Sequence, residues 1–595
     1  MEVADDVVFR LQWFGYQPFN SCGAMNNATR FLWQPVRLIL LLILCWSLAT
    51  PAWAQTPAWQ WAQAISPVTL VEKPTADEGS VAGQKVAVDA LGNVYVVGSF
   101  IGNARFGTLT LTASESSADV FVAKLDPAGQ WQWAVRAGGT SIDAATGVAV
   151  DASGSVYIVG NFLSPRADFG ATTLTNTGGS DVFVAKLDPA GQWQWAVGAG
   201  GVEVERVNEI ALDKSGNVLI AGDFFSPSAR FGPMTLTNNT LMSLDLFVAK
   251  LDPAGQWQWA IRAGGTGNES AAGVALDGNN NVFLTGEFNS PDVRFGATSL
   301  AAENGSTDVF VAKLNPEGEW QWATKAGGSA GTDVGNSVAV DKSGNVLVTG
   351  YFLSPRADFG TTTLTSSGSS DVFVAKLNPS GQWQWAVKAG GLADDRSNCI
   401  AVDGAGNAVV TGYFLSPSSL FGLSNLTNSG PLGVDLFVAK LNPEGEWQWA
   451  AKADGTADDT GRGLAVDASG NVLVTGYFLS PSALFGTTAL TNSGLYTGFV
   501  AKLLGGVTTA QTRSTTLEWR VFPNPAAESV TIQLANWNGA NLLSLVDSQG
   551  RCVRKMQLVN QRGPLDISLR GLAPGFYLVQ VTSTAGIASR RLVVQ

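Results

Sequence analysis

The chain has 595 residues, which is enough for several domains. Its 68 glycines and 20 tryptophans, with only 14% charged residues, are typical of a turn-rich β protein rather than a disordered chain. The net charge of −12 argues against nucleic-acid and anionic-membrane partners. The absence of histidine excludes histidine-dependent triads and histidine-ligated zinc, and leaves carboxylate chemistry and oxygen-ligated Ca²⁺ open.

The first 54 residues are typical of a secretory signal region. Arg37 precedes an apolar run over residues 38–48, and Ala52-Trp53-Ala54 follows it. This order predicts cleavage between Ala54 and Gln55. The run is too short for a membrane-spanning helix, so we expect no transmembrane helix in the mature chain. Met25 is a candidate true start, with residues 1–24 as a gene-model artefact.

One short segment, Phe-Val-Ala-Lys-Leu, recurs through most of the remaining chain. Its seven copies begin at Phe121, Phe183, Phe247, Phe310, Phe373, Phe437 and Phe499. A regular recurrence of this kind indicates one supersecondary unit, repeated so that each copy buries its apolar face against its neighbours. Seven copies of a strand-rich unit predict an all-β fold, a seven-bladed β-propeller over residues 55–504.

Each unit contains four predicted strands, which we designate A to D. In the second unit they are residues 147–151, 156–160, 181–187 and 193–197. Turn residues separate A from B and C from D, as hairpins require. The order is permuted along the chain, because it starts with a D strand at Trp59 and ends with a C strand at Phe499. We expect these two strands to pair and close the ring, which removes open sheet edges.

The connections between strands differ in how much they vary. The B–C and D–A connections emerge on one face of a propeller, and all the length variation of the repeat falls there. Loops that vary on a rigid scaffold are where function usually lies. We therefore expect a ligand on this face or at the axial channel.

Two repeated features favour packing roles. The Trp-Gln-Trp pairs begin each D strand, and they include Trp59 and Trp61, Trp131 and Trp133, and Trp193 and Trp195. We expect them to pack between blades, with aromatic platforms for sugars as the alternative. Lys124, Lys186 and their equivalents in the other C strands are expected to lie over a tryptophan of the neighbouring D strand.

Carboxylates give the weak candidates for a metal site. The Asp-x-x-Gly-Asn turns, such as residues 89–93, lack the alternating carboxylates of a calcium cage, so we expect their aspartates to bond local backbone amides. A second set precedes strand A and could ring the channel mouth: Asp77, Asp143, Glu205, Glu269, Asp333, Asp394 and Asp458. Ca²⁺ is the one cofactor that this set would suit, and no catalytic residue is assigned.

The pattern changes after the last repeat. Residues 505–516 are small and polar and predict a linker. Residues 517–595 contain short alternating stretches at 529–534, 542–547, 565–569 and 575–581, which predict a small β-sandwich.

This C-terminal region carries an ordered set of motifs. They are Val-Phe-Pro-Asn-Pro with Pro523, Asn524 and Pro525, a turn ending at Gly550, Ala-Pro-Gly-Phe-Tyr with Gly575 and Tyr577, and a terminal Arg-Arg-Leu-Val-Val. The set resembles the type A C-terminal sorting domain of the type IX (Por) secretion system of Bacteroidetes. Phe522 stands where tyrosine is common in that family. The resemblance implies passage through the periplasm, recognition by the secretion machinery, and release or attachment at the outer-membrane surface.

The repeats in turn resemble the bacterial seven-bladed propeller repeat family, which implies a fold and no single activity. We expect a secreted or surface-attached, monomeric scaffold or binding module for a glycan or protein ligand. The alternative is a carbohydrate-active hydrolase or lyase that uses carboxylates on the B–C/D–A face. Two close carboxylates from non-equivalent positions would favour the enzyme.

Overall fold

The structure is a computed structural model. It describes residues 57–68, 79–114, 117–238, 240, 242–430, 433–505, 519–524, 526–534, 540–547, 552–558, 563–583 and 586–595. The signal region and the predicted cleavage site lie outside these residues, as do Asp77, Pro525, Gly550 and the linker core. Every element in the described ranges is a β-strand, so the all-β prediction is confirmed.

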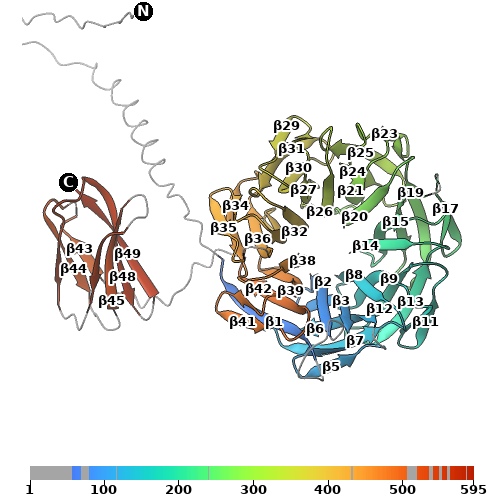
Figure 1. Cartoon of the computed structure of the whole chain (residues 1–595), viewed down its shortest axis with the longest axis horizontal. Coiled ribbons are helices and arrows are strands. Elements are labelled where there is room, and N and C mark those ends of the chain that lie inside the picture. Colours follow the sequence, from blue (N-terminus) through green and yellow to red (C-terminus); the bar gives the residue numbers. More distant parts are fainter. Residues whose placement is uncertain are drawn as a thin grey trace, which may run out of the picture. The chain divides into compact units, whose positions relative to one another are not determined.

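Six sheets of four antiparallel strands and one six-stranded sheet form a ring (Figure 1). Strands A are β2 (Ser80–Val88), β8 (Asp143–Val150), β14 (Glu205–Leu212), β20 (Glu269–Leu276), β26 (Asp333–Val340), β32 (Asp395–Val402) and β38 (Asp459–Val466). Strands B are β3 (Val94–Ile101), β9 (Val156–Phe162), β15 (Val218–Phe224), β21 (Val282–Phe288), β27 (Val346–Phe352), β33 (Ala408–Phe414) and β39 (Val472–Phe478).

The outer half of each sheet holds the two repeated motifs. Strands C are β6 (Ala118–Leu125), β12 (Asp181–Leu187), β18 (Asp245–Leu251), β24 (Asp308–Leu314), β30 (Asp371–Leu377), β36 (Asp435–Leu441) and β42 (Thr497–Leu503). Strands D are β7 (Trp131–Ala137), β13 (Trp193–Ala199), β19 (Trp257–Ala263), β25 (Trp320–Ala326), β31 (Trp383–Ala389), β37 (Trp447–Lys452) and β1 (Trp59–Pro67). We number the sheets as blades 1 to 7 in the order of their A strands.

Each B–C connection folds into a small hairpin that sequence analysis left as a loop. The hairpins are β4 (Asn103–Phe106) with β5 (Leu109–Thr112), β10 (Arg166–Phe169) with β11 (Thr172–Thr175), β16 (Ser228–Phe231) with β17 (Met234–Thr237), β22 (Val293–Phe295) with β23 (Thr298–Leu300), β28 (Arg356–Phe359) with β29 (Thr362–Thr365), β34 (Ser418–Phe421) with β35 (Ser424–Thr427), and β40 (Ser482–Phe485) with β41 (Thr488–Thr491). Their phenylalanine packs inward; in the second unit the Phe169 and Phe183 ring centroids lie 4.8 Å apart.

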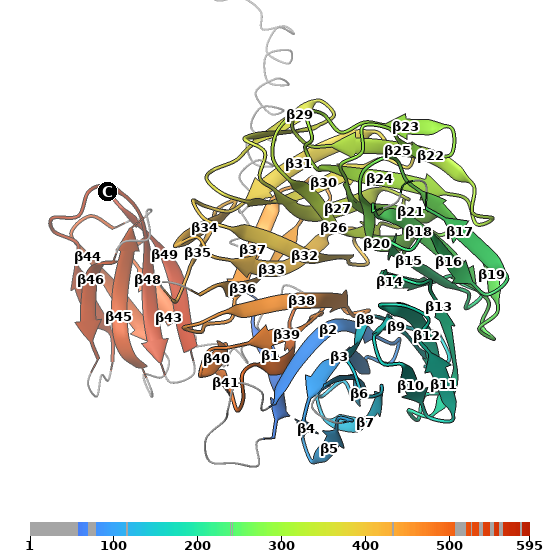
Figure 2. The ribbon, with the colours of Figure 1, turned by 45° about the vertical axis from the view of Figure 1, so that its right-hand side comes forward.

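The ring closes as the sequence predicts. In every blade the order is A-B-C-D, with A innermost at the axis, as Figure 2 also shows. In blade 7 the outermost strand is β1, which pairs antiparallel with β42 from Ile65 opposite Gly498 to Trp59 opposite Leu503. The first and last strands of the ring thus share one sheet, and the predicted closure is confirmed.

The apolar cores lie within and between adjacent blades. One cluster joins Val97 and Val122 of blade 1 with Val148 and Phe183 of blade 2. Strand B is buried on both faces, and its valines, leucines and isoleucines suit such a strand. The blades are therefore held to one another by side-chain packing, as in other repeat architectures.

The C-terminal region forms two sheets of its own. One contains β43 (Trp519–Phe522), β44 (Ser529–Leu534) and β47 (Leu565–Ser568), and the other contains β45 (Ala540–Asp547), β46 (Cys552–Gln557), β48 (Gly575–Ser583) and β49 (Gly586–Val594). Both contribute to one core that includes Val530, Leu545, Val579 and Leu592. The predicted β-sandwich is confirmed.

Candidate functional site

A part-buried ion pair joins the A strands of two blades that are not neighbours in the ring. Lys85 of β2 lies 2.6 Å from Glu209 of β14, although the two residues are 124 positions apart in the sequence. The Sγ atom of Cys399 on β32 lies 3.9 Å from the same ammonium. Burial lowers the pKa of Lys85, but the neighbouring Cys399 and Glu209 side chains outweigh it and raise that pKa. The ammonium is therefore charged at neutral pH and ties blades 1, 3 and 6 across the axis.

A β-bulge in each A strand sets these side chains. The register of strands A and B shifts at equivalent positions in every blade, for example between Val207 and Glu209. The extra residue reaches the next blade, so Asn208 donates to the Ala271 carbonyl at 2.9 Å. A bulge re-aims side chains, and in blade 3 it turns Asn208 towards blade 4 and precedes Glu209, the partner of Lys85.

The channel mouth is lined by one strand B position that differs between blades. This position lies between the glycine and the phenylalanine of each B strand, and it holds Ser99, Asn161, Asp223, Glu287, Tyr351, Tyr413 and Tyr477. The flanking glycine and phenylalanine are the same in all seven blades. We call the stretch from Asp223 to Tyr477, with the arginines between them, the mouth arc.

The half of the mouth arc on blades 3 and 4 is acidic. Asp223 is 2% exposed and accepts a hydrogen bond of 2.7 Å from the Ser270 hydroxyl. Burial raises the pKa of Glu287, and the charge of Asp223 raises it further. An open pocket of about 510 Å³ lies here, lined among others by Arg206, Asn268 and Glu287. This half offers a carboxylate, an amide and an exposed guanidinium to a polar ligand.

The half on blades 5 to 7 combines tyrosines with arginines. The Arg396 guanidinium lies 4.3 Å from the Tyr351 ring centroid, and that of Arg462 lies 5.4 Å from the Tyr477 ring. Burial raises the pKa of Tyr413, which both arginines then lower in part. A guanidinium over an aromatic face is held in place while its edge can still donate hydrogen bonds. This half therefore presents two oriented cationic donors.

The carboxylates that precede strand A lie at the blade junctions and do not ring the channel mouth as predicted. Asp143, Glu205, Glu269 and Asp333 are each at most 1% exposed, and they lie at the blade junctions. Asp143 accepts hydrogen bonds from the Gly139 amide at 2.7 Å and the Ser164 hydroxyl at 2.6 Å. Their oxygens thus hold the D–A and B–C connections together rather than facing the channel.

In blades 6 and 7 the predicted carboxylates, Asp394 and Asp458, are each one residue before the position equivalent to Asp143. The positions equivalent to Asp143 in blades 6 and 7 are Asp395 and Asp459, not Asp394 and Asp458. Both pairs are adjacent aspartates, so spacing alone could not separate them. Among the residues that the structure describes, no group of three or more carboxylate or cysteine side chains could hold a metal ion.

The aspartate turns between strands A and B bond their own backbone. Asp341 accepts from the amides of Ser343 and Asn345, both at 2.9 Å, and from the Asn345 side chain at 2.8 Å. These donors hold the pKa of Asp341 below its usual range in spite of partial burial. The same pattern recurs in the other blades, as expected for an Asx turn.

The repeated lysines of strand C do not lie over tryptophans. Lys124, Lys186 and Lys313 lie over strand B rings, those of Tyr95, Tyr157 and Phe283, at 4.7–5.1 Å. In the other blades the lysine pairs with the aspartate that ends strand A, at 2.8–3.3 Å. Each lysine stands between a strand B side chain and a strand D tryptophan in the sheet, as Lys124 does between Tyr95 and Trp133, and the described cation–π contacts are those with the strand B ring.

The tryptophans pack between and within blades. In blades 1 to 5 the second one of the pair donates its indole N–H to a proline carbonyl in the next blade; for Trp133 and Pro189 the distance is 3.2 Å. The first packs edge-on against the hairpin phenylalanine, as Trp131 does against Phe106 at 5.2 Å. These contacts favour the packing role over a platform for sugars.

Three comparisons with known proteins bear on this architecture. Residues 520–595 match the family of secretion system C-terminal sorting domains, and residues 321–351 match the β-propeller repeat family. The chain carries a propeller of bacterial repeats and a C-terminal sorting domain. The sorting domain indicates export by the type IX system to the cell surface or the medium. In it, Asn524 accepts from the Val593 amide at 2.8 Å and Tyr577 donates to the Ala573 carbonyl at 2.8 Å, so both motif residues shape the sandwich.

Parts of this chain are similar to other proteins. A WD repeat-containing protein of Acanthamoeba polyphaga mimivirus is 24% identical over 452 residues, covering 60% of this chain and 32% of that protein. The regulatory protein FlaEY of Caulobacter vibrioides is 25% identical over 341 residues, covering 53% and 34%. A crystal structure from Dyadobacter fermentans is 12% identical and covers 75% of this chain and 99% of that one, with a TM-score of 0.34. The chain spans about a third of the length of the two curated relatives.

The described part of the chain contains no helix that is both long and apolar enough to cross a membrane.

Proposed function

We propose that this protein is an exported binding module whose ligand, a glycan or a segment of another protein, docks on the mouth arc. The observation that carries the proposal is the single strand B position that changes from blade to blade between an invariant glycine and phenylalanine. The side chains at this position are partly buried, apart from the buried Asp223, and a position that varies between repeated packing residues suits a binding site on a scaffold.

The chemistry of the arc suits a ligand with polar groups at both ends. Arg396 and Arg462 are held against tyrosine rings and would bind a carboxylate or the hydroxyl groups of a sugar. Glu287, Asn268 and Asn289 line the acidic end and would accept or donate hydrogen bonds to hydroxyl or amide groups.

A carbohydrate-active enzyme is the second candidate function. It is favoured by the pocket on blades 3 and 4, which is lined by Glu269 and Glu287, carboxylates from non-equivalent positions. Glu269, however, is already engaged by the Gly265 amide and the Ser290 hydroxyl, as its equivalents are at other junctions. That leaves Glu287 without a second free carboxylate as partner in the pocket, which supports binding over hydrolysis.

The test is a glycan and peptide array probed with the purified mature chain, followed by assays for turnover of every ligand that binds. We expect saturable binding that falls at least about tenfold in Arg396→Ala, and no product. Glu287→Gln separates the two functions: loss of turnover with binding retained would establish the enzyme and refute the binding module. Glu303→Gln, an exposed carboxylate outside the arc, is the matched control.

A further inference from the structure

Pairs of buried carboxylates recur at the blade junctions. At six junctions an aspartate that begins or nearly begins strand C lies beside the carboxylate that begins the next A strand. The strand C members are Asp119, Asp181, Asp245, Asp308, Asp371 and Asp435, and the strand A members are Asp143, Glu205, Glu269, Asp333, Asp395 and Asp459. Burial raises the pKa of Glu205, Glu269, Asp333 and Asp459, and in each case the strand C aspartate beside it raises that pKa further.

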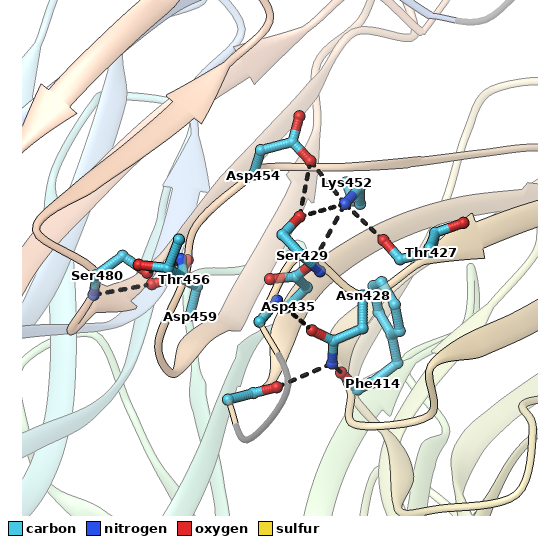
Figure 3. A network of polar contacts seen from close by, with 12 residues as sticks. Phe414, Thr427, Asn428, Ser429, Asp435, Lys452, Asp454, Thr456, Asp459 and Ser480 are labelled. Carbon is cyan, nitrogen blue, oxygen red and sulfur yellow. Dashed lines mark hydrogen bonds and ion pairs between the residues drawn. The ribbon is translucent and has the colours of Figure 1, made fainter.

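A cation from strand D neutralises five of these six aspartates. Arg136, Arg262, Lys325, Lys388 and Lys452 occupy equivalent positions in strand D and lie 2.7–3.2 Å from the strand C aspartate of their own blade. In Figure 3, Lys452 contacts Asp435 and also donates to Ser429 and to the Thr427 carbonyl. A buried carboxylate needs such a partner, because its desolvation is otherwise uncompensated.

Blade 2 is the exception. Gly198 stands opposite Phe183, where five other blades place the arginine or lysine. Asp181 is still buried, at 3% exposed, and its Oδ2, the oxygen that the cation binds in those blades, accepts only from the Thr177 amide at 2.8 Å and hydroxyl at 2.9 Å. Its Oδ1 has no hydrogen-bond partner, which is also true of Asp119, Asp371 and Asp435. Asp181 therefore retains its burial and its place in the pair but has lost the cation.

Blade 7 has neither the strand C aspartate nor the strand D cation. There Thr497 replaces the aspartate and Ala64, opposite Phe499, replaces the cation. Blade 7 therefore has no buried charge at these two positions. Blade 2 keeps the aspartate without the cation, which costs stability unless another cation takes its place.

The missing side chain leaves a pocket. An open cavity of about 510 Å³ is lined by Asp181, Thr177, Gly198, Gly201 and Arg230 among others. A Cβ at Gly198 would lie 3.6 Å from the Val182 carbonyl and 4.0 Å from Leu174, and the backbone there is not left-handed. Neither conformation nor space therefore requires glycine at this position.

We propose that this pocket binds the guanidinium or ammonium group of an arginine or lysine side chain from a protein partner. The guest would donate to Oδ2 of Asp181, as Arg136 and Arg262 donate to the Oδ2 atoms of Asp119 and Asp245 in the blades on either side. The exposed Arg230 at the rim makes no ion pair with Asp181 in the described contacts, and its positive charge repels a divalent ion more strongly than a singly charged side chain. This site is independent of the mouth arc.

The experiment measures binding of N-acetylarginine amide and n-butylammonium to the mature chain by calorimetry, with CaCl₂ as a separate arm. We expect one saturable site for the organic cations in the native chain, and binding at least about tenfold weaker in both Gly198→Arg and Asp181→Asn. The first variant fills the pocket from within and the second removes the acid, so failure of one to fold leaves the other as a test.

Arg136→Gly is the matched control, because it creates the same vacancy beside Asp119 in blade 1. It should add a second site of similar affinity. Equal affinity in the native chain, Gly198→Arg and Asp181→Asn would overturn the proposal. A saturable response to CaCl₂ alone that is lost in Asp181→Asn would overturn it too, since the pocket would then be a metal site. An intact response in Arg396→Ala separates this site from the mouth arc.

Discussion

The outer edge of the ring and the mouth arc follow opposite rules. At the edge, the tryptophan pair of strand D and the aspartate turns recur with the same partners in blade after blade. At the mouth, one position runs from Ser99 through Asp223 and Glu287 to three tyrosines. The difference teaches that equivalence between blades marks scaffold, and we propose that departures from it, at the arc and at Gly198, are ligand sites. Substitutions at the edge should therefore cost stability, and those at the arc should cost binding.

The largest effect should follow removal of residues 57–68. Strand β1 supplies the outer edge of blade 7, and its Ile65 is fully buried. Without it the ring has an open edge, and we expect the melting temperature to fall by more than about 10 °C. Scanning calorimetry with and without a synthetic peptide of residues 57–68 is the measurement. A truncated chain that melts at the same temperature, or that the peptide does not stabilise, would contradict the closure.

Substitution of a single tryptophan at the outer edge should destabilise the fold less than removal of strand β1. Trp195→Ala removes the hydrogen bond to the Pro253 carbonyl and the ring that packs on Gly255, so we expect a loss of about 2 to 3 kcal/mol in the free energy of unfolding. Denaturant titration checks the value, with the exposed Gln194→Ala as the control at under about 0.5 kcal/mol. A small loss at Trp195 with reduced glycan binding would instead favour a sugar platform.

The ion pair across the axis should show strong coupling. Lys85→Met leaves Glu209 buried without a partner, and we expect a loss of about 3 kcal/mol. The double variant Lys85→Met, Glu209→Met should recover most of it, because no buried charge is left. A double-mutant cycle by denaturant unfolding gives the coupling; additive losses would show that the two charges do not interact.

Acidification should stabilise the ring through its junction carboxylates. Burial raises the pKa of Glu269 and of Asp459 to about 7, from 4.5 and 3.8. The folded chain then binds more protons than the unfolded chain between those values, so stability falls as pH rises from about 4.5 to 7. Between pH 5 and pH 7.5 the free energy of unfolding should fall less in Glu269→Gln than in the native chain, by about 1 to 3 kcal/mol. An unchanged slope would mean that Glu269 is ionised throughout.

Some features of the fold could be predicted from the sequence and others could not, depending on the sequence pattern that marks each feature. The strands, the closure through Trp59–Trp61 and the sorting domain follow from apolar alternation, turn residues and ordered motifs, and all appear in the structure. The strands of the short hairpins, such as Arg166–Phe169, have too few residues to show a clear alternation of apolar and polar side chains. The bulge in each A strand shifts the register, and spacing could not choose Asp395 over Asp394.

The mouth arc and the Gly198 pocket were missed for a different reason. Their residues carry no motif, and each is ordinary within its own strand. The signal lies in comparing equivalent positions across the repeats: Asp223 against Tyr351 after the strand B glycine, and Gly198 against Arg136 in strand D. Which of those differences meet at one surface depends on the ring geometry, because some arc contacts cross to the next blade, as between Asp223 and Ser270 or between Tyr351 and Arg396.

The most direct test of the account is to measure ligand binding and stability together for Arg396→Ala and Trp195→Ala, using a ligand found on the array. We predict that Arg396→Ala loses at least about tenfold in affinity with a change in unfolding free energy under about 0.5 kcal/mol, and that Trp195→Ala shows the reverse. If Arg396→Ala binds as tightly as the native chain while Trp195→Ala folds normally and loses binding, the ligand lies on the repeated edge and the account is wrong.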